Sequence, residues 1–262
     1  MDPKPAASTV PSAKPDREPW QRVPLVHVPA SKAFFKLLKM SDAVPVVLPP
    51  TDQKKRERTR QAEASLGIAS SVYAYVGYAG PTFGTIAILF DMECSRSCDG
   101  TTTPFDTGGL HCGYIRATFP LHTERQRREY FQTNSRPMAH LGQHFYAFLN
   151  VSYAGGPIPY VEGHRPDRDD DSGRHHHPDN EREAWTWEAQ ASRLSLSAAL
   201  ALYLAPDEFE AVMRELRYRT VHPIWLTLMA ENRIRKADVL NPGGVSRWVE
   251  QEIVTWLQPA AS

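Results

Sequence analysis

Cysteine is scarce in this chain, with three residues in 262. An odd and small number in a chain of this length does not form a disulfide framework and is typical of a reducing compartment. No apolar run reaches the roughly 18 residues that a membrane-spanning helix needs. Residues 1–20 also have no apolar core of the signal-peptide type. These absences predict a cytoplasmic protein without a membrane partner.

The chain has no excess of either charge, because 30 Lys and Arg residues balance 30 Asp and Glu residues. No net field therefore attracts it to nucleic acid, and any such partner would have to be bound by a local patch. The two commonest nucleotide-binding motifs, the P-loop and G-x-G-x-x-G, do not occur. A nucleotide, if one is bound, must be held in another way.

Apolar residues make up 41% of the chain, which is enough to bury a core. Residues 1–20 are rich in Pro, Ala, Ser and charge and predict a disordered arm, followed by a single domain over 21–262. The expected strands lie at residues 22–28, 70–80, 84–91, 184–191 and 199–206. Helices are expected at residues 31–39, 52–67 and 139–154 and at the C-terminus, and Ser31 is expected to cap the first of them. A further helix is expected to begin with a capping box of Asp207 and Glu210.

The runs at 70–80 and 84–91 are expected to pair with each other across Gly-Pro turn residues. Two polar stretches, 92–136 and 155–183, predict long loops. Strands and helices are mixed without regular alternation. This order favours an α+β fold with a mixed or antiparallel β core and flanking helices.

Glu188 stands in "AWTWEAQA", a stretch typical of buried β-structure. A carboxylate beside Trp185 and Trp187 would experience a low dielectric constant and could stabilise a cationic centre. Alternatively, the two-residue period places the tryptophans toward the core and Glu188 and Gln190 toward solvent. The spacing alone is compatible with both interpretations.

The order of candidate residues along the chain favours the functional interpretation. His27 ends the first strand, tyrosines crowd the next one in "VYAYVGY", and Glu188 lies on a late strand. This order resembles the His-Tyr-Glu branch of the ADP-ribosyltransferase superfamily, which includes the DarT-like toxins. The resemblance implies an ADP-ribosyltransferase-like fold and a catalytic domain that uses NAD as a substrate. It also implies a glycosyltransferase that modifies nucleic acid or protein, as a toxin or antiviral defence effector with a possible antitoxin or regulator.

The resemblance also implies a role for each residue of the motif. His27 would hold a ribose hydroxyl of NAD, Tyr73 or Tyr75 would stack on nicotinamide, and Glu188 would stabilise the ribosyl cation as nicotinamide leaves. This chemistry requires no metal, and none is predicted. Thr186 stands where a common variant of the family's motif carries Glu or Gln, and the family associates the acidic variant with arginine acceptors, so the resemblance does not extend to an arginine acceptor.

The stretch "TTTPFDTGGL" is a second candidate site. Asp106 is followed by Thr107, Gly108 and Gly109, and such a flexible turn can offer backbone donors to a phosphate or sugar. We therefore include Asp106 and Gly108 among the predicted NAD-binding residues. The alternative is a tight Asx-type turn with no ligand.

Two alternatives to the transferase remain from other patterns. The loop "DRDDDSGRHHHPD" at 167–179 carries acids and imidazoles that could bind a metal in a hydrolase, although consecutive histidines in a polar segment also suit a solvated loop. The single C-x3-C pair, Cys94 and Cys98, could join Cys112 or His111 around a structural zinc. The remaining possibility is a non-catalytic interaction module whose long loops bind a partner.

Overall fold

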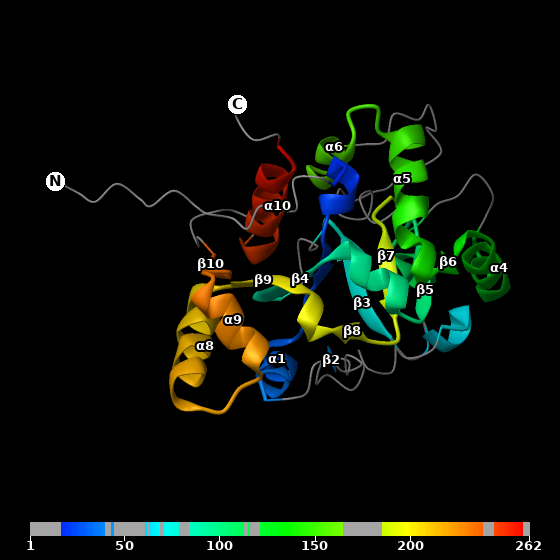
Figure 1. The fold of residues 1–262 in the computed structure, drawn as a ribbon. Helices are drawn as coiled ribbons and strands as arrows, with labels where there is room; N and C mark the ends of the chain where they lie inside the picture. The colour runs from blue at the N-terminus through cyan, green and yellow to red at the C-terminus, as the bar shows by residue number, and fades with distance from the viewer. Residues whose placement is uncertain are drawn as a thin grey trace.

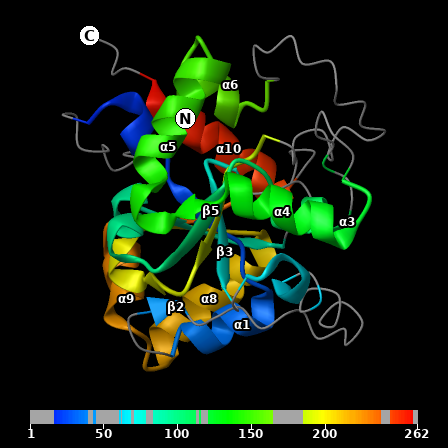
Figure 2. The same cartoon turned by 90° about the vertical axis from the view of Figure 1, so that its right-hand side faces the viewer.

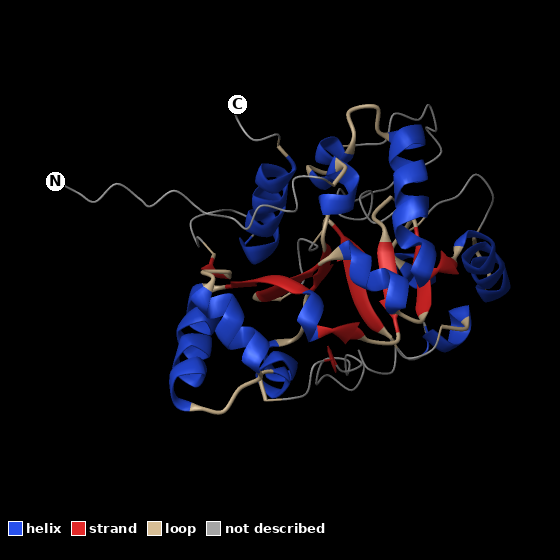
Figure 3. Ribbon diagram, in the orientation of Figure 1, coloured by secondary structure: helices blue, strands red, loops and turns tan. Residues whose placement is uncertain are grey.

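The computed structural model describes residues 17–39, 43–44, 61, 63–68, 71–78, 84–112, 115, 121–164, 185–237 and 244–258. The predictions for residues 1–16, for most of the helix at 52–67 and for the Asp/His loop at 167–179 lie outside these ranges. The protein has an α+β fold with an open, mostly antiparallel sheet and helices packed around it (Figures 1 and 3). Among the described helices, none combines the length and the apolar composition that crossing a membrane would require.

The main sheet has eight strands in the order β10-β9-β4-β1-β3-β7-β5-β6. Among the strands that the structure describes, only the β10–β9 pair is parallel, and a separate two-stranded sheet joins β2 to β8. The strands are β1 (Leu25–His27), β2 (Ala43–Val44), β3 (Val72–Val76), β4 (Ile86–Phe90), β5 (Gly100–Thr103), β6 (Arg136–Pro137), β7 (Glu188–Ala191), β8 (Leu194–Ser195), β9 (Ala199–Leu204) and β10 (Ile234–Lys236).

The expected pairing of the second and third predicted strands is wrong, because β1 lies between β3 and β4. Val26 on β1 is opposite Tyr75 on one side and Leu89 on the other. All three residues of β1 are buried, so its backbone groups need hydrogen-bond partners on both edges. A central place in the sheet provides them.

Helices cover both faces of the sheet, as the two views in Figures 1 and 2 show. One side carries α5 (Leu141–Ser152), α6 (Pro157–Val161) and α10 (Gly244–Leu257), and the other carries α1 (Ser31–Leu37), α8 (Pro206–Tyr218) and α9 (Pro223–Ala230). Aromatic contacts occur in both helical layers, in one between a helix and the sheet and in the other between two helices. Tyr203 of β9 packs on Trp248 of α10 at 4.9 Å between ring centroids, and Phe34 of α1 packs on Trp225 of α9 at 5.5 Å.

Two of the predicted helix starts differ from the structure. The N-cap of α8 is Ala205, which makes no side-chain cap, so the capping box of Asp207 and Glu210 is wrong. Pro206 instead opens the helix with a φ suited to the first turn. The N-cap of α1 is Ala30, one residue before the expected Ser31.

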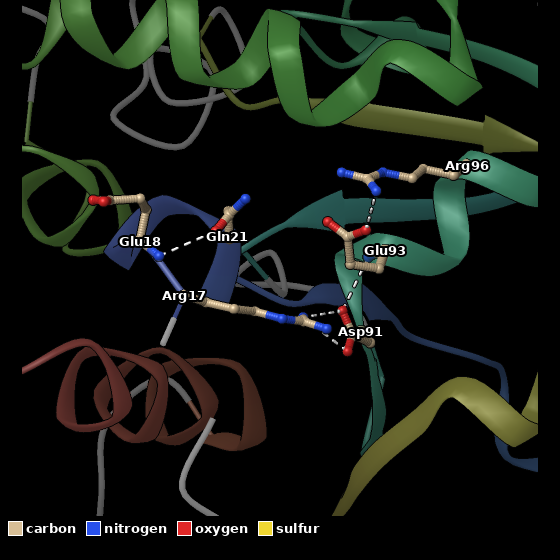
Figure 4. A network of polar contacts seen from close by, with 6 residues as sticks. All are labelled: Arg17, Glu18, Gln21, Asp91, Glu93 and Arg96. Carbon is tan, nitrogen blue, oxygen red and sulfur yellow. Dashed lines mark hydrogen bonds and ion pairs between the residues drawn. The ribbon is translucent and has the colours of Figure 1, made fainter. Parts of the chain in front are cut away.

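The stretch 92–136 is not a long loop. It contains the 3-10 helix η2 (Met92–Ser97), β5, and the helices α3 (Thr107–Cys112) and α4 (Glu124–Asn134), and it reaches β6. The segment 155–183 contains α6 in its described part. The N-terminal arm also ends before residue 20: Arg17 forms an ion pair with Asp91 at 2.8 Å, and the 3-10 helix η1 begins at Pro19 (Figure 4).

Candidate active site

Strand β7 places Glu188 between β3 and β5, and its register decides which side chains surround it. Residues directly opposite each other on neighbouring strands point to the same face of a sheet. Two such rows lie side by side here, Tyr75–Glu188–Thr103 and Tyr73–Gln190–Thr101. The two tyrosines that the sequence offered as alternatives therefore share the face of Glu188.

This face does not point to solvent, so the solvent-exposed interpretation of Glu188 is wrong. Glu188 and Gln190 are each only 1% exposed. A second hydrophobic cluster accompanies the α3–α4 region, formed by Leu66, Phe105, Leu110, Ile115, Leu121 and Phe131, and α3 and α4 lie against each other (Figure 2). The two-residue alternation was correct, but both faces of β7 are covered.

The Glu188 carboxyl group is held by hydrogen bonds from two neighbours. Its Oε1 accepts from the Thr107 hydroxyl at 2.5 Å and from the Gln190 amide at 2.6 Å. The backbone N–H of Thr107 also donates to it, at 3.3 Å. Burial raises the pKa of Glu188 well above its ordinary value, and the negative charge of Asp106 raises it further. The folded environment therefore favours the protonated form of Glu188 more than water does.

Asp106 is the second member of a buried carboxyl pair, because it lies close enough to Glu188 for its charge to act on the Glu188 carboxyl group. It is 7% exposed. Its Oδ2 accepts from the Tyr75 hydroxyl and its Oδ1 from the backbone N–H of Gly109, both at 2.5 Å. The Tyr75 hydroxyl and the backbone N–H of Gly109 thus stabilise negative charge on the Asp106 side chain.

The backbone of the "FDTGG" turn is used differently from the prediction. The N–H groups of Thr107 and Gly109, expected to face a phosphate, donate to Glu188 and Asp106 instead. Asp106 thus caps the first turn of α3, which agrees with the Asx-type alternative. Gly108 is exposed, and a Cβ at this position would lie 3.0 Å from Asp106 Oδ1.

A third carboxyl group, that of Glu63, is hydrogen-bonded to Tyr73. The tyrosine hydroxyl donates to Glu63 Oε1 at 3.0 Å. Burial raises the pKa of Tyr73, and the charges of Glu188, Glu63 and Asp106 raise it further, so the phenol remains protonated. Sequence reasoning missed Glu63, which stands in a charged helical segment like many solvated residues. The two-residue period did place Gln190 on the same face as Glu188, and the structure has the two side chains in contact.

His27 lies apart from this group. Val26 is the residue opposite Tyr75, so the next residue of β1 faces the other side of the sheet. The His27 ring is buried, its Nδ1 donates to the Tyr73 carbonyl oxygen at 2.8 Å, and its Nε2 has no hydrogen-bond partner among the described residues. Burial lowers the pKa of His27 to about 4, so the ring is neutral. The predicted His-Tyr-Glu set therefore does not share one face.

No metal centre is assembled by the described residues, where no three His, Cys, Asp or Glu side chains are placed to hold an ion. Cys94 and Cys98 lie at η2, whereas His111 and Cys112 end α3. Comparison with known proteins adds no assignment: no family model, curated protein or solved structure matches the chain. The chemistry of the site must be argued from its own residues.

Proposed function

We propose that the protein is an NAD-dependent mono-ADP-ribosyltransferase with an ADP-ribosyltransferase-like fold, and that Glu188 and Asp106 form the centre of its active site. The observation that carries this proposal is the buried carboxyl pair beside two tyrosines on one sheet face. The acceptor would be a macromolecule, nucleic acid or protein. A role as a toxin or defence effector, with an antitoxin or regulator, belongs to the same proposal.

A buried carboxyl pair is costly for a protein that needs it only for stability. Moving ionisable groups out of water is unfavourable unless they are paired and hydrogen-bonded, and well-packed apolar residues usually serve a core at least as well. Strongly perturbed carboxyl groups are therefore concentrated at functional sites. Glu188 is such a carboxyl group, and it is grouped with Asp106 and Tyr75.

The pair has the chemistry that cleavage of NAD requires. The bond between C1′ of the ribose and the nicotinamide nitrogen breaks, and its electron pair leaves with the nicotinamide, which becomes neutral. Positive charge then develops at C1′, and negative charge on the Asp106–Glu188 pair stabilises it electrostatically. An acceptor oxygen or nitrogen bonds to C1′, and its proton passes to the ionised member of the pair. Tyr73 and Tyr75 supply rings on the same face for the nicotinamide.

The test is release of nicotinamide from NAD, measured by chromatography with and without added nucleic acid or protein acceptors. Glu188→Gln keeps the shape of the side chain and removes its acid function, so turnover should fall by roughly 10²-fold or more. Glu129→Gln, at an exposed position of α4, is the matched control and should retain activity. Equal activity of Glu188→Gln and wild type, with both proteins folded by circular dichroism, would refute the proposal.

The same assay separates the alternatives. The transferase should be insensitive to chelators and to replacement of His175, His176 and His177 by serine, whereas a metal-dependent hydrolase would lose activity in both cases. An interaction module would release no nicotinamide at all. The role that the resemblance implies for His27 remains a prediction, which calorimetric titration of NAD into His27→Ala tests separately.

A further inference from the structure

Two of the three cysteines form a thiol pair away from the carboxyl site. Cys94 lies on η2, and Cys98 is the residue at which this helix ends. The Cys98 thiol donates to the Cys94 carbonyl oxygen at 3.0 Å, and the two thiols are close enough to influence each other's ionisation. Both residues are partly exposed. The thiols are therefore adjacent and within reach of a small reagent.

The surroundings make the two thiols unequal. The hydrogen bond from Cys94 and the positive charge of Arg193 outweigh burial and the charge of Asp99, and they lower the pKa of Cys98 to about 7. The pKa of Cys94 is raised by the same hydrogen bond, by burial, and by the charges of Cys98 and Asp91. Cys98 is thus the thiol that ionises near neutral pH, and thiolates are the nucleophiles in thiol–disulfide exchange.

The backbone on either side of the pair is anchored. Asp91 accepts from the Glu93 N–H at 3.0 Å and caps the start of η2, while its ion pair with Arg17 ties it to the N-terminal segment (Figure 4). After Cys98, the carbonyl oxygen of Asp99 accepts from the Ser192 N–H at 2.8 Å. The chain leaves the helix at Cys98 with extended backbone angles. The segment that carries the two thiols is therefore held at both of its ends.

We propose that Cys94 and Cys98 are a redox-active pair that forms a reversible intramolecular disulfide with a small-molecule disulfide of the glutathione type as oxidant. The Cys98 thiolate attacks the oxidant, forming a mixed disulfide and releasing one thiolate. Cys94 then loses its proton to solvent and attacks the Cys98 sulfur, and a second thiolate leaves. The cysteine pair is oxidised by two electrons and the small disulfide is reduced to two thiols. This inference does not depend on the proposed NAD chemistry.

The experiment treats the full chain with oxidised glutathione at pH 7, blocks the remaining thiols with iodoacetamide and digests with trypsin. Arg96 lies between the two cysteines, so a Cys94–Cys98 bond joins peptide 61–96 to peptide 97–116 in the mass spectrum. The same link should form in Cys112→Ser and disappear on reduction. In Cys94→Ser, the reaction should stop at a glutathione adduct on Cys98.

The thiolate argument has its own test in the rate of Cys98 alkylation, measured on the wild type. The rate should rise with pH with a midpoint near 7. At pH 7 the Arg193→Gln variant should react more slowly by up to about fivefold, the effect of one surface charge. The matched control is Arg96→Gln, an exposed arginine of η2 paired with Glu93, which should react like the wild type.

Three results would overturn the proposal. They are a stable glutathione adduct on Cys98 of the wild type, a bond from Cys98 to Cys112 closed within peptide 97–116, and an alkylation midpoint near the ordinary thiol value of 9. Because the last measurement uses only the wild-type chain, it decides the thiolate argument even where a cysteine variant is unstable.

Discussion

Replacing Glu188 by glutamine should change how the stability of the protein depends on pH. The pKa of Glu188 is raised in the folded protein, chiefly by burial and then by the charge of Asp106, above its ordinary value of 4.5. Below pH 4.5 the group is protonated in both the folded and the unfolded chain and adds no pH dependence. Above pH 4.5 the group loses its proton in the unfolded chain, whereas the folded chain still holds it. The contribution of Glu188 to the unfolding free energy therefore falls as the pH rises. Wild type should therefore lose stability with rising pH relative to Glu188→Gln.

The magnitude follows from one proton. Between 4.5 and the raised folded pKa, the folded wild type holds one proton more than its unfolded chain, which corresponds to about 1.4 kcal/mol for each pH unit. The amide of glutamine keeps the side-chain length and carries no titratable proton. Asp106 retains its bonds from Tyr75 and Gly109 in both proteins. The difference in unfolding free energy between the two proteins should therefore rise at about that slope.

The measurement is urea unfolding at half-unit pH intervals from 4.5 upward, followed by the fluorescence of the six tryptophans. Glu129→Gln on the surface of α4 is the control, and its curve should run parallel to that of the wild type. Parallel curves for Glu188→Gln and wild type would show that the folded chain holds no extra proton, and the buried carboxyl pair would have to be abandoned.

Two further predictions concern the frame around the site. Burial lowers the pKa of His27 from 6.5 to about 4, so the unfolded chain takes up a proton at this residue before the folded chain does as the pH falls. Between these two pH values, wild type should lose about 3 kcal/mol of unfolding free energy relative to His27→Gln. Equal acid sensitivity of the two proteins in urea unfolding would contradict this prediction. Gly100 has a φ of +136°, and a Cβ there would overlap the backbone carbonyl of Gln190. Gly100→Ala should therefore lower the unfolding free energy by roughly 2 kcal/mol or more. Gly67→Ala is the control and should lower it by about 1 kcal/mol, because no atom lies within 4 Å of a Cβ there. Similar melting temperatures of the two variants would show that β5 can move away from β7.

Apolar patterns in the sequence predicted the frame of the fold better than its polar parts. The runs of β1, β3, β4 and β9 and the helical period of α5 all correspond to elements of the structure. Strand β5 escaped prediction because its sequence, Gly-Thr-Thr-Thr, is polar. Its hydroxyls are satisfied inside the sheet, as when Thr102 donates to the Glu188 carbonyl oxygen at 2.8 Å. A buried strand of this kind has no apolar signature.

The surroundings of Glu188 also could not be predicted from the sequence. The two-residue period correctly places Glu188 and Trp187 on opposite faces of the sheet, but it does not predict which residues cover each face. The partner that covers Glu188 is Thr107, 81 positions earlier in the chain. No local pattern specifies that contact, because it depends on the order β3-β7-β5 and on the short helix that follows β5. The same topology places the His27 side chain on the opposite sheet face from the Tyr73 and Tyr75 side chains, although the chain order alone favoured a common site.

Burial of Glu188 has a direct consequence for the proposed reaction. At 1% exposure its carboxyl group cannot touch NAD until the segment that covers it moves, and that segment is the turn from Asp106 to Gly109. Its displacement would break the bonds from Thr107 to Glu188 and from Tyr75 to Asp106 and would admit water or substrate. Burial is the largest cause of the raised pKa of Glu188, so opening lowers that pKa and favours the ionised carboxylate. The movement that admits NAD would thereby favour negative charge on Glu188 beside the developing ribosyl cation.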